Sequence, residues 1–165
     1  MLYYAAEVGM TTAEKLVKRL AELGKTCGTA ESCTGGGVGS AITAVPGSSE
    51  VFMGGVISYD NSVKCGILGV SPDTLATVGA VSRETAAQMA SGARKALNVD
   101  YAVSVTGIAG PGGGTAEKPV GLVWFGIASQ NGVMAEKEFF TGNREEVRAA
   151  AVEHALAMLI TACRP

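Results

Sequence analysis

Ser32 lies in a glycine-rich run, Ala30-Glu31-Ser32-Cys33-Thr34-Gly35-Gly36-Gly37, between a strand-like stretch at 26–30 and a helix-like stretch at 38–45. A hydroxyl at a strand-to-helix turn stands clear of the backbone, and the first free N–H groups of the new helix point the same way. Those N–H groups can hold a developing negative charge, and glycines let a substrate approach the backbone closely. The run therefore predicts that Ser32 is a nucleophile.

A serine nucleophile needs a base, and the sequence offers one histidine and several lysines. His154 lies inside the last predicted helix among Ala and Leu, which is typical of a structural histidine. A lysine base must be neutral, so burial or a neighbouring cation must lower its pKa well below about 10.4. Lys64 closes the segment Ser58-Tyr59-Asp60-Asn61-Ser62-Val63-Lys64 at the end of a predicted strand, where open α/β sheets gather their active sites. We expect Lys64 as base and Tyr59 as proton relay or donor, although such residues are also common without a catalytic role.

A second glycine-rich stretch runs from Thr106 to Gly114, after a predicted strand at 101–105. Such a loop can present several backbone N–H groups to an anion or a carbonyl, or it can be a plain connector. Neither glycine cluster matches the G-x-G-x-x-G or P-loop patterns. Arg144 begins the last predicted helix, where a cation is slightly unfavourable for the helix dipole. Arg144 is therefore a surface charge, or it is held there to meet a phosphate or carboxylate.

The elements that must position these residues alternate along the chain. Thr11 and Glu14 form a capping box, which starts a helix that Gly24 ends. Further helices are expected at 60–68, 82–97 and 144–162, with a turn or short helix opening at 71–73. Strands are expected at 26–30, 51–59, 101–105, 120–128 and 133–140, and the apolar strand 51–59 is expected at the centre of the sheet. Gln130-Asn131-Gly132 predicts a hairpin turn.

This alternation predicts a three-layer α/β/α sandwich with a mixed, mostly parallel sheet of about five or six strands. At 165 residues the chain is expected to form a single domain over 1–165, with segment 1–10 at its periphery. The hydrophobic fraction of 47% and the mean hydropathy of +0.28 argue against disorder. The same apolar character leads us to expect a homo-oligomer.

Composition also excludes several classes of protein. The net charge is −2 with mixed signs, so no basic stripe suits a nucleic-acid partner. No apolar run reaches the roughly 18 residues of a membrane span. The first ten residues contain Glu7 and lack a basic start, so we expect no signal peptide and a cytoplasmic protein. The four cysteines form no CxxC pair and there is one histidine, so we expect buried thiols and no metal site.

Taken together, these motifs resemble the family of the C-terminal domain of the competence/damage-inducible protein CinA. That domain also occurs alone as a nicotinamide-nucleotide amidase. The resemblance covers about 12–159 and rests on segments 30–36, 54–64, 81–82, 106–113 and 119–123.

The resemblance implies deamidation of nicotinamide mononucleotide to nicotinate mononucleotide and ammonia, a salvage step for NAD synthesis, without metal or other cofactor. The family's catalytic serine, tyrosine and lysine correspond here to Ser32, Tyr59 and Lys64. Ser32 would attack the carboxamide carbon, and Lys64, helped by Tyr59, would accept the serine proton and pass one to ammonia. Arg144 would pair with the substrate phosphate. The other implied binding positions are Thr34, Gly35 and Gly36, as backbone donors to the oxyanion, and Asn61, Thr106, Gly107, Gly112 and Gly113.

Three alternatives remain open at this point. The chain could be a non-catalytic nucleotide-binding or partner-interaction module that keeps the glycine loops without the chemistry. It could be an amidase for another small carboxamide. Cys33 is a rival nucleophile, because a thiolate is intrinsically more reactive than a hydroxyl.

Overall fold

Five strands and six α-helices make up residues 7–163, the part of the chain that the computed structural model describes. The helices are α1 (Thr12–Leu23), α2 (Gly37–Thr43), α3 (Asn61–Gly66), α4 (Pro72–Thr77), α5 (Arg83–Leu97) and α6 (Arg144–Ala162), with a 3₁₀ turn at Ser48–Glu50. The strands are β1 (Cys27–Glu31), β2 (Phe52–Ile57), β3 (Tyr101–Gly107), β4 (Leu122–Ser129) and β5 (Gly132–Phe139). The predicted single domain over 1–165 and its peripheral segment 1–10 extend outside the described residues.

The strands form one mixed sheet in the order β2-β1-β3-β4-β5. β1 pairs in parallel with β2 and with β3, whereas β4 is antiparallel to both β3 and β5. Four of the five strands therefore run in one direction, and the β4–β5 hairpin supplies the exception. The predicted mixed, mostly parallel sheet is confirmed.

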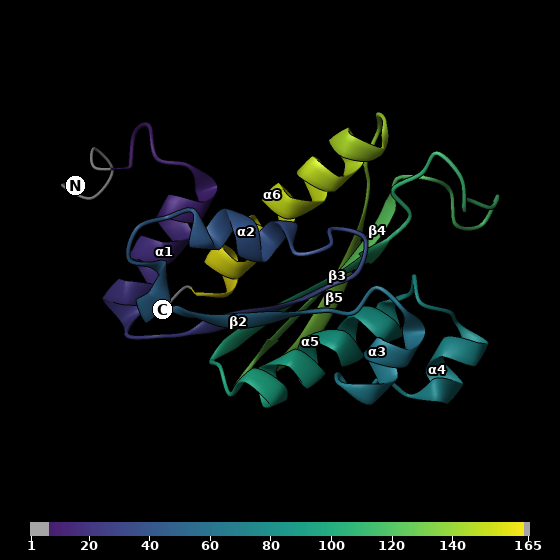
Figure 1. Cartoon of the computed structure of the whole chain (residues 1–165), viewed down its shortest axis with the longest axis horizontal. Coiled ribbons are helices and arrows are strands. Elements are labelled where there is room, and N and C mark those ends of the chain that lie inside the picture. Colours follow the sequence, from purple (N-terminus) through teal and green to yellow (C-terminus); the bar gives the residue numbers. More distant parts are fainter. Residues whose placement is uncertain (1–6, 164–165) are drawn as a thin grey trace.

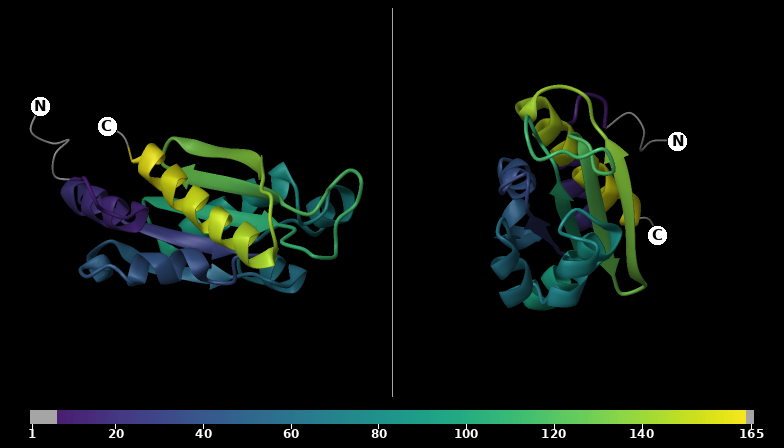
Figure 2. Two further views of the ribbon diagram at one scale, coloured as in Figure 1. Left: turned by 90° about the horizontal axis from the view of Figure 1, so that it is seen from above. Right: turned by 90° about the vertical axis from the view of Figure 1, so that its right-hand side faces the viewer.

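Helices cover both faces of the sheet, as Figures 1 and 2 show. On one face, α1, α2 and α6 bury an apolar cluster that includes Leu16, Ile42, Phe125 and Leu156. On the other face, α5 buries a smaller cluster that includes Met89. Burial of these side chains on both faces is the main favourable term that holds the three layers together.

Local capping signals fix where the helices begin. The predicted capping box between Thr11 and Glu14 is present at α1, and Asn143 and Glu146 form another at α6. Ser82 caps α5 as expected, through its side chain and the N–H of Thr85. None of the helices within residues 7–163 has the length and apolar character needed to cross a membrane.

The prediction that strand 51–59 is central was wrong, because β2 is an edge strand. Its side chains alternate between half-buried and exposed, and those of Met53 and Ile57 are 46% and 56% exposed. The apolar side chain of Phe52 packs against the cluster under α2. The mostly apolar segment is therefore an edge strand with two exposed apolar side chains, which hydropathy alone does not distinguish from a central strand buried on both faces.

β1, β2 and β3 end together and place the serine turn. The N–H of Ser32 donates to the carbonyl of Val105 at 2.9 Å, and the N–H of Ser58 donates to the carbonyl of Glu31 at 2.8 Å. The loop that follows β3 projects from the same end of the domain (Figure 1). The carboxyl ends of the parallel strands thus gather the segments that the sequence singled out.

Candidate active site

Ser32 and Lys64 form a buried pair at the ends of β1 and β2. Nζ of Lys64 lies 3.1 Å from Oγ of Ser32, and also donates to the carbonyls of Ser58 at 2.7 Å and Tyr59 at 3.2 Å. The side chain of Lys64 is 1% exposed, and Ser32 is 9% exposed. The structure therefore brings the predicted nucleophile and the predicted base into hydrogen-bond contact.

Burial lowers the pKa of Lys64 below its ordinary value of 10.5, and the negative charge of Asp60 only partly opposes this shift. A neutral lysine carries two N–H donors and one lone pair. With both N–H groups directed at the carbonyls of Ser58 and Tyr59, the lone pair is left for the hydroxyl of Ser32. The three contacts therefore suit a lysine that accepts the serine proton.

Helix α3 carries Lys64 back toward Ser32. Asp60 is its N-cap, and its Oδ1 accepts the N–H of Ser62 at 2.8 Å. Hydrogen bonds from the side chain and backbone of Ser62 hold the pKa of Asp60 below its usual range, so the cap stays ionised. A capped turn directly after β2 thus fixes the distance from the strand end to the lysine.

Glu31 takes the place that sequence analysis assigned to the substrate. Its carboxylate is buried and accepts the N–H groups of Val38 at 2.8 Å and Gly39 at 3.0 Å. The first N–H groups of α2 are therefore already occupied, and the expectation that they hold the developing charge is corrected. A buried carboxylate must be hydrogen-bonded, and the positive end of α2 satisfies it.

The serine turn still has unoccupied donors. The N–H of Gly35 donates to the carbonyl of Ser32 at 3.1 Å, and that of Gly37 to the carbonyl of Thr34 at 3.0 Å. Within residues 7–163, the backbone N–H of Thr34 has no partner, and its buried hydroxyl has none either. Among the described residues, two of the predicted donors in this turn, the N–H groups of Thr34 and Gly36, are therefore unoccupied and could meet an oxyanion, whereas the N–H of Gly35 is engaged.

Cys33 is poorly suited to be the nucleophile. Its side chain is 6% exposed and packs in the core under α2 and α6. Burial raises the pKa of the Cys33 thiol to about 11, so the thiol is protonated at neutral pH. The neighbouring hydroxyl of Ser32 faces Lys64, whereas the thiol faces the core.

Tyr59 and Arg144 meet at the surface beside the pair. The side chain of Tyr59 is 64% exposed, and its hydroxyl lies 3.4 Å from Nη2 of Arg144. Nη1 of Arg144 donates to the carbonyl of Gly110 at 2.8 Å, which ties α6 to the loop after β3. Tyr59 contacts Lys64 through its carbonyl and not through its phenol, so its catalytic role stays a prediction.

The remaining predicted binding residues divide into buried and exposed groups. The hydroxyl of Thr106 is buried and donates to the carbonyl of Ala80 at 2.8 Å, so this donor serves the fold. At Gly107 a Cβ would lie 2.7 Å from Val123, so β4 leaves no room for a side chain. Three others are exposed at the same end of the domain, namely Asn61 in α3 and Gly112 and Gly113 in the projecting loop.

Arg148, one turn after Arg144 in α6, contacts the serine turn although it is not among the predicted site residues. Its Nε donates to the carbonyl of Cys33 at 3.0 Å and its Nη2 to the carbonyl of Thr34 at 3.2 Å. The signal that could have found it is the spacing of four, which places both arginines on one side of a helix. Arg148 thus binds two backbone carbonyls of the serine turn from α6, which lies on the same face of the sheet as α2.

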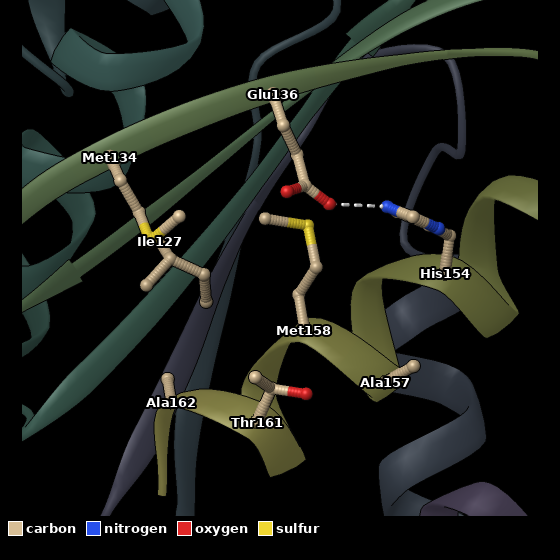
Figure 3. Close-up of a pocket in the computed structure, with 8 residues that line it drawn as sticks. All are labelled: Ile127, Met134, Glu136, His154, Ala157, Met158, Thr161 and Ala162. Carbon is tan, nitrogen blue, oxygen red and sulfur yellow. Dashed lines mark hydrogen bonds and ion pairs between the residues drawn. The ribbon is translucent and has the colours of Figure 1, made fainter.

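His154 contacts β4 and β5, whereas Ser32 and Lys64 lie at the ends of β1 and β2. The contacts of His154 are structural. Its Nε2 lies 2.8 Å from Oε1 of Glu136, and its ring packs 4.5 Å from that of Phe125. Figure 3 shows His154 and Glu136 at an apolar pocket of about 290 Å³ between the β4–β5 hairpin and α6. Glu136, Glu138 and His154 are the group with donor atoms close enough to hold a metal ion among the described residues.

The fold and the site define an α/β domain with a serine–lysine pair at the carboxyl ends of its parallel strands. The model of the CinA C-terminal domain matches residues 10–163, so the chain belongs to that family, as the sequence motifs predicted. A CinA-like protein of Leptospira borgpetersenii is 60% identical over 129 residues, which cover 78% of this chain and 31% of that protein. A putative competence-damage inducible protein of Moorella thermoacetica is 48% identical over 134 residues, 81% of this chain and 32% of that one. The chain spans about a third of the length of these curated relatives.

Solved structures of the family have the same fold. The competence/damage inducible protein CihA of Agrobacterium tumefaciens superposes with a TM-score of 0.88 at 46% identity, over 94% of this chain and 98% of that one. A competence-damaged protein (CinA) superfamily protein of Escherichia coli gives a TM-score of 0.88 at 35% identity, over 92% of this chain and 88% of that one. The described residues therefore have the fold of these CinA-family structures.

Proposed function

We propose that this protein hydrolyses the carboxamide of nicotinamide mononucleotide to nicotinate mononucleotide and ammonia, with Ser32 as nucleophile and Lys64 as base. The observation that carries the proposal is the 3.1 Å contact between Lys64 and Ser32, made by a lysine whose pKa burial lowers. A module that only bound nucleotides would have no need to bury a lysine against a hydroxyl. The nucleotide substrate is inferred from membership of the family.

In the acylation step, Oγ of Ser32 attacks the carboxamide carbon while Nζ of Lys64 accepts the hydroxyl proton. The carbonyl oxygen becomes an oxyanion, which the unoccupied N–H of Thr34 is placed to stabilise. Collapse of this intermediate breaks the C–N bond, and the proton from Lys64 leaves with ammonia. The product of this step is an ester between Ser32 and the pyridine carboxylate.

In the second step, a water molecule replaces ammonia and Lys64 accepts its proton. Hydroxide adds to the ester carbon, and the intermediate expels Oγ of Ser32, which recovers its proton from Lys64. The products are nicotinate mononucleotide and the free enzyme. Arg144, whose guanidinium lies at the surface beside the hydroxyl of Tyr59, supplies a positive charge for the substrate phosphate.

Ammonia release from nicotinamide mononucleotide by the wild-type protein, with a chelator present, tests this proposal. Nicotinamide riboside serves as the matched substrate that lacks the phosphate. We expect turnover of the nucleotide that chelation does not change, and a higher KM for the riboside. Absence of turnover would contradict the proposal and would favour a nucleotide-binding module or an amidase for another carboxamide.

A further inference from the structure

Arg148 bridges two consecutive carbonyls of the serine turn. Nε donates to the carbonyl of Cys33 at 3.0 Å and Nη2 to that of Thr34 at 3.2 Å. The residue is half-buried in α6, which packs against α2 and the sheet. A planar guanidinium presents donors in a fixed fork, so these two contacts restrain both carbonyls at once.

The direction of a carbonyl sets the direction of the next N–H. In a planar trans peptide, the C=O of one residue and the N–H of the next point in opposite directions. The carbonyl of Cys33 shares its peptide unit with the N–H of Thr34, and the carbonyl of Thr34 shares its unit with the N–H of Gly35. Because Arg148 draws both carbonyls toward α6, both N–H groups point away from it.

These two N–H groups differ in whether they are hydrogen-bonded. The N–H of Gly35 closes the turn on the carbonyl of Ser32, whereas that of Thr34 has no partner within residues 7–163. On the other side of the turn, Glu31 binds the N–H groups of Val38 and Gly39, so α2 cannot supply them to a substrate. The N–H of Thr34 is thus a donor whose direction Arg148 sets.

We propose that Arg148 is a positioning residue, which holds the serine turn so that the N–H of Thr34 faces the oxyanion formed at Ser32. This inference rests on the proposed amide hydrolysis for its catalytic consequence. A residue that sets an oxyanion donor acts in the transition state and leaves ground-state binding nearly unchanged. Arg148 therefore differs from Arg144, whose proposed partner is the substrate phosphate and whose loss should raise KM.

The kinetic test compares Arg148→Ala and Arg148→Lys with the wild type. We expect kcat of Arg148→Ala to fall about 100-fold, as when one oxyanion donor is lost, with little change in KM. Arg148→Lys should recover little of the loss, because a lysine is a point donor that cannot hold two carbonyls. Recovery of kcat in Arg148→Lys, or a higher KM at unchanged kcat, would overturn the proposal.

Arg94→Ala is the matched control. Nε of Arg94 donates to the carbonyl of Asp100 at 3.0 Å, the same kind of contact, at the start of β3. Its loss should leave kcat unchanged. If both alanine variants lowered kcat equally, the effect of Arg148 would be a general loss of structure and the proposal would fail.

An NMR measurement separates this inference from the proposed function. The amide resonances of Thr34 and Gly35 in the wild type, Arg148→Ala and Arg94→Ala report the turn whether or not the protein turns over any substrate. We expect those resonances to move or broaden in Arg148→Ala alone, while that of Ile42 in α2 stays in place. Unchanged resonances would refute the positioning role, even in an active enzyme. Shifted resonances in a protein without turnover would keep the positioning of the turn and refute the hydrolysis.

Discussion

Nζ of Lys64 lies 3.1 Å from Oγ of Ser32, although the two residues are 32 positions apart in the chain. Parallel pairing of β1 with β2, in which Glu31 lies opposite Ile57, brings the residues after each strand side by side. Helix α3 then returns Lys64 over the end of β1. The contact therefore depends on sheet register and on one capped helical turn.

The pH dependence of turnover should report the ionisation of Lys64. The protonated lysine has no lone pair, so kcat/KM should be low at acidic pH and should rise as pH increases through the pKa of Lys64. Burial lowers that pKa below 10.5, so the rise should be centred at a lower pH than the titration of an ordinary lysine. A profile of kcat/KM against pH checks this, with Lys64→Met as the inactive control. A rise centred at an ordinary lysine pKa would contradict the assignment.

Replacement of Cys33 should leave the chemistry intact. The thiol is buried and its pKa of about 11 keeps it protonated, so Cys33→Ala should retain kcat within about threefold. Alkylation of the wild type, followed by peptide mass spectrometry, should modify the half-buried Cys65 before Cys33. Loss of turnover in Cys33→Ala with the fold preserved would instead make the cysteine the nucleophile.

Glu31→Gln should weaken both the fold and the site. The glutamine keeps the shape but replaces charge-assisted hydrogen bonds to the N–H groups of Val38 and Gly39 with neutral ones. We expect the free energy of unfolding to fall by about 2 kcal/mol, and kcat to fall because the serine turn follows directly. Urea denaturation checks this, with the exposed Glu50→Gln as control. Equal stability of Glu31→Gln and the wild type would show that the carboxylate charge is not needed.

Gly92→Ala should destabilise the domain. A Cβ at Gly92 in α5 would lie 1.8 Å from the carbonyl oxygen of Leu68, so α5 or the chain after α3 must move. We expect a loss of about 1–3 kcal/mol of unfolding free energy. Gly66→Ala is the control, because within residues 7–163 no atom beyond its chain neighbours and its own helix backbone lies within 4 Å of its Cβ position. Thermal unfolding of both variants checks the contrast, and equal melting temperatures would contradict it.

The sequence predicted the parts of this protein that depend on local chemistry. The capping box at Thr11 and Glu14 and the hairpin at Asn131-Gly132 are set by neighbouring residues, and both are confirmed. The contact between Ser32 and Lys64 was predictable because Ser32 directly follows one predicted strand and Lys64 lies on the segment that leaves another. The motifs that resemble the CinA family, at 30–36 and 54–64, include the same two residues.

The parts that depend on the order of strands and the packing of layers were not predictable. The apolar residues of β2 did not indicate that this strand lies at the edge of the sheet, because hydropathy does not report strand order. The carboxylate of Glu31 and the guanidinium of Arg148 act across elements that only the folded chain brings together. The close approach of Gly92 in α5 to the backbone of Leu68 likewise joins segments that are distant in the sequence.

The most direct test of the central claim is the rate of ammonia release from nicotinamide mononucleotide by the wild type and by Ser32→Ala, with circular dichroism to verify that both are folded. The serine–lysine assignment predicts turnover by the wild type and a loss of at least about 1000-fold in Ser32→Ala. Turnover by a folded Ser32→Ala at the wild-type rate would contradict it.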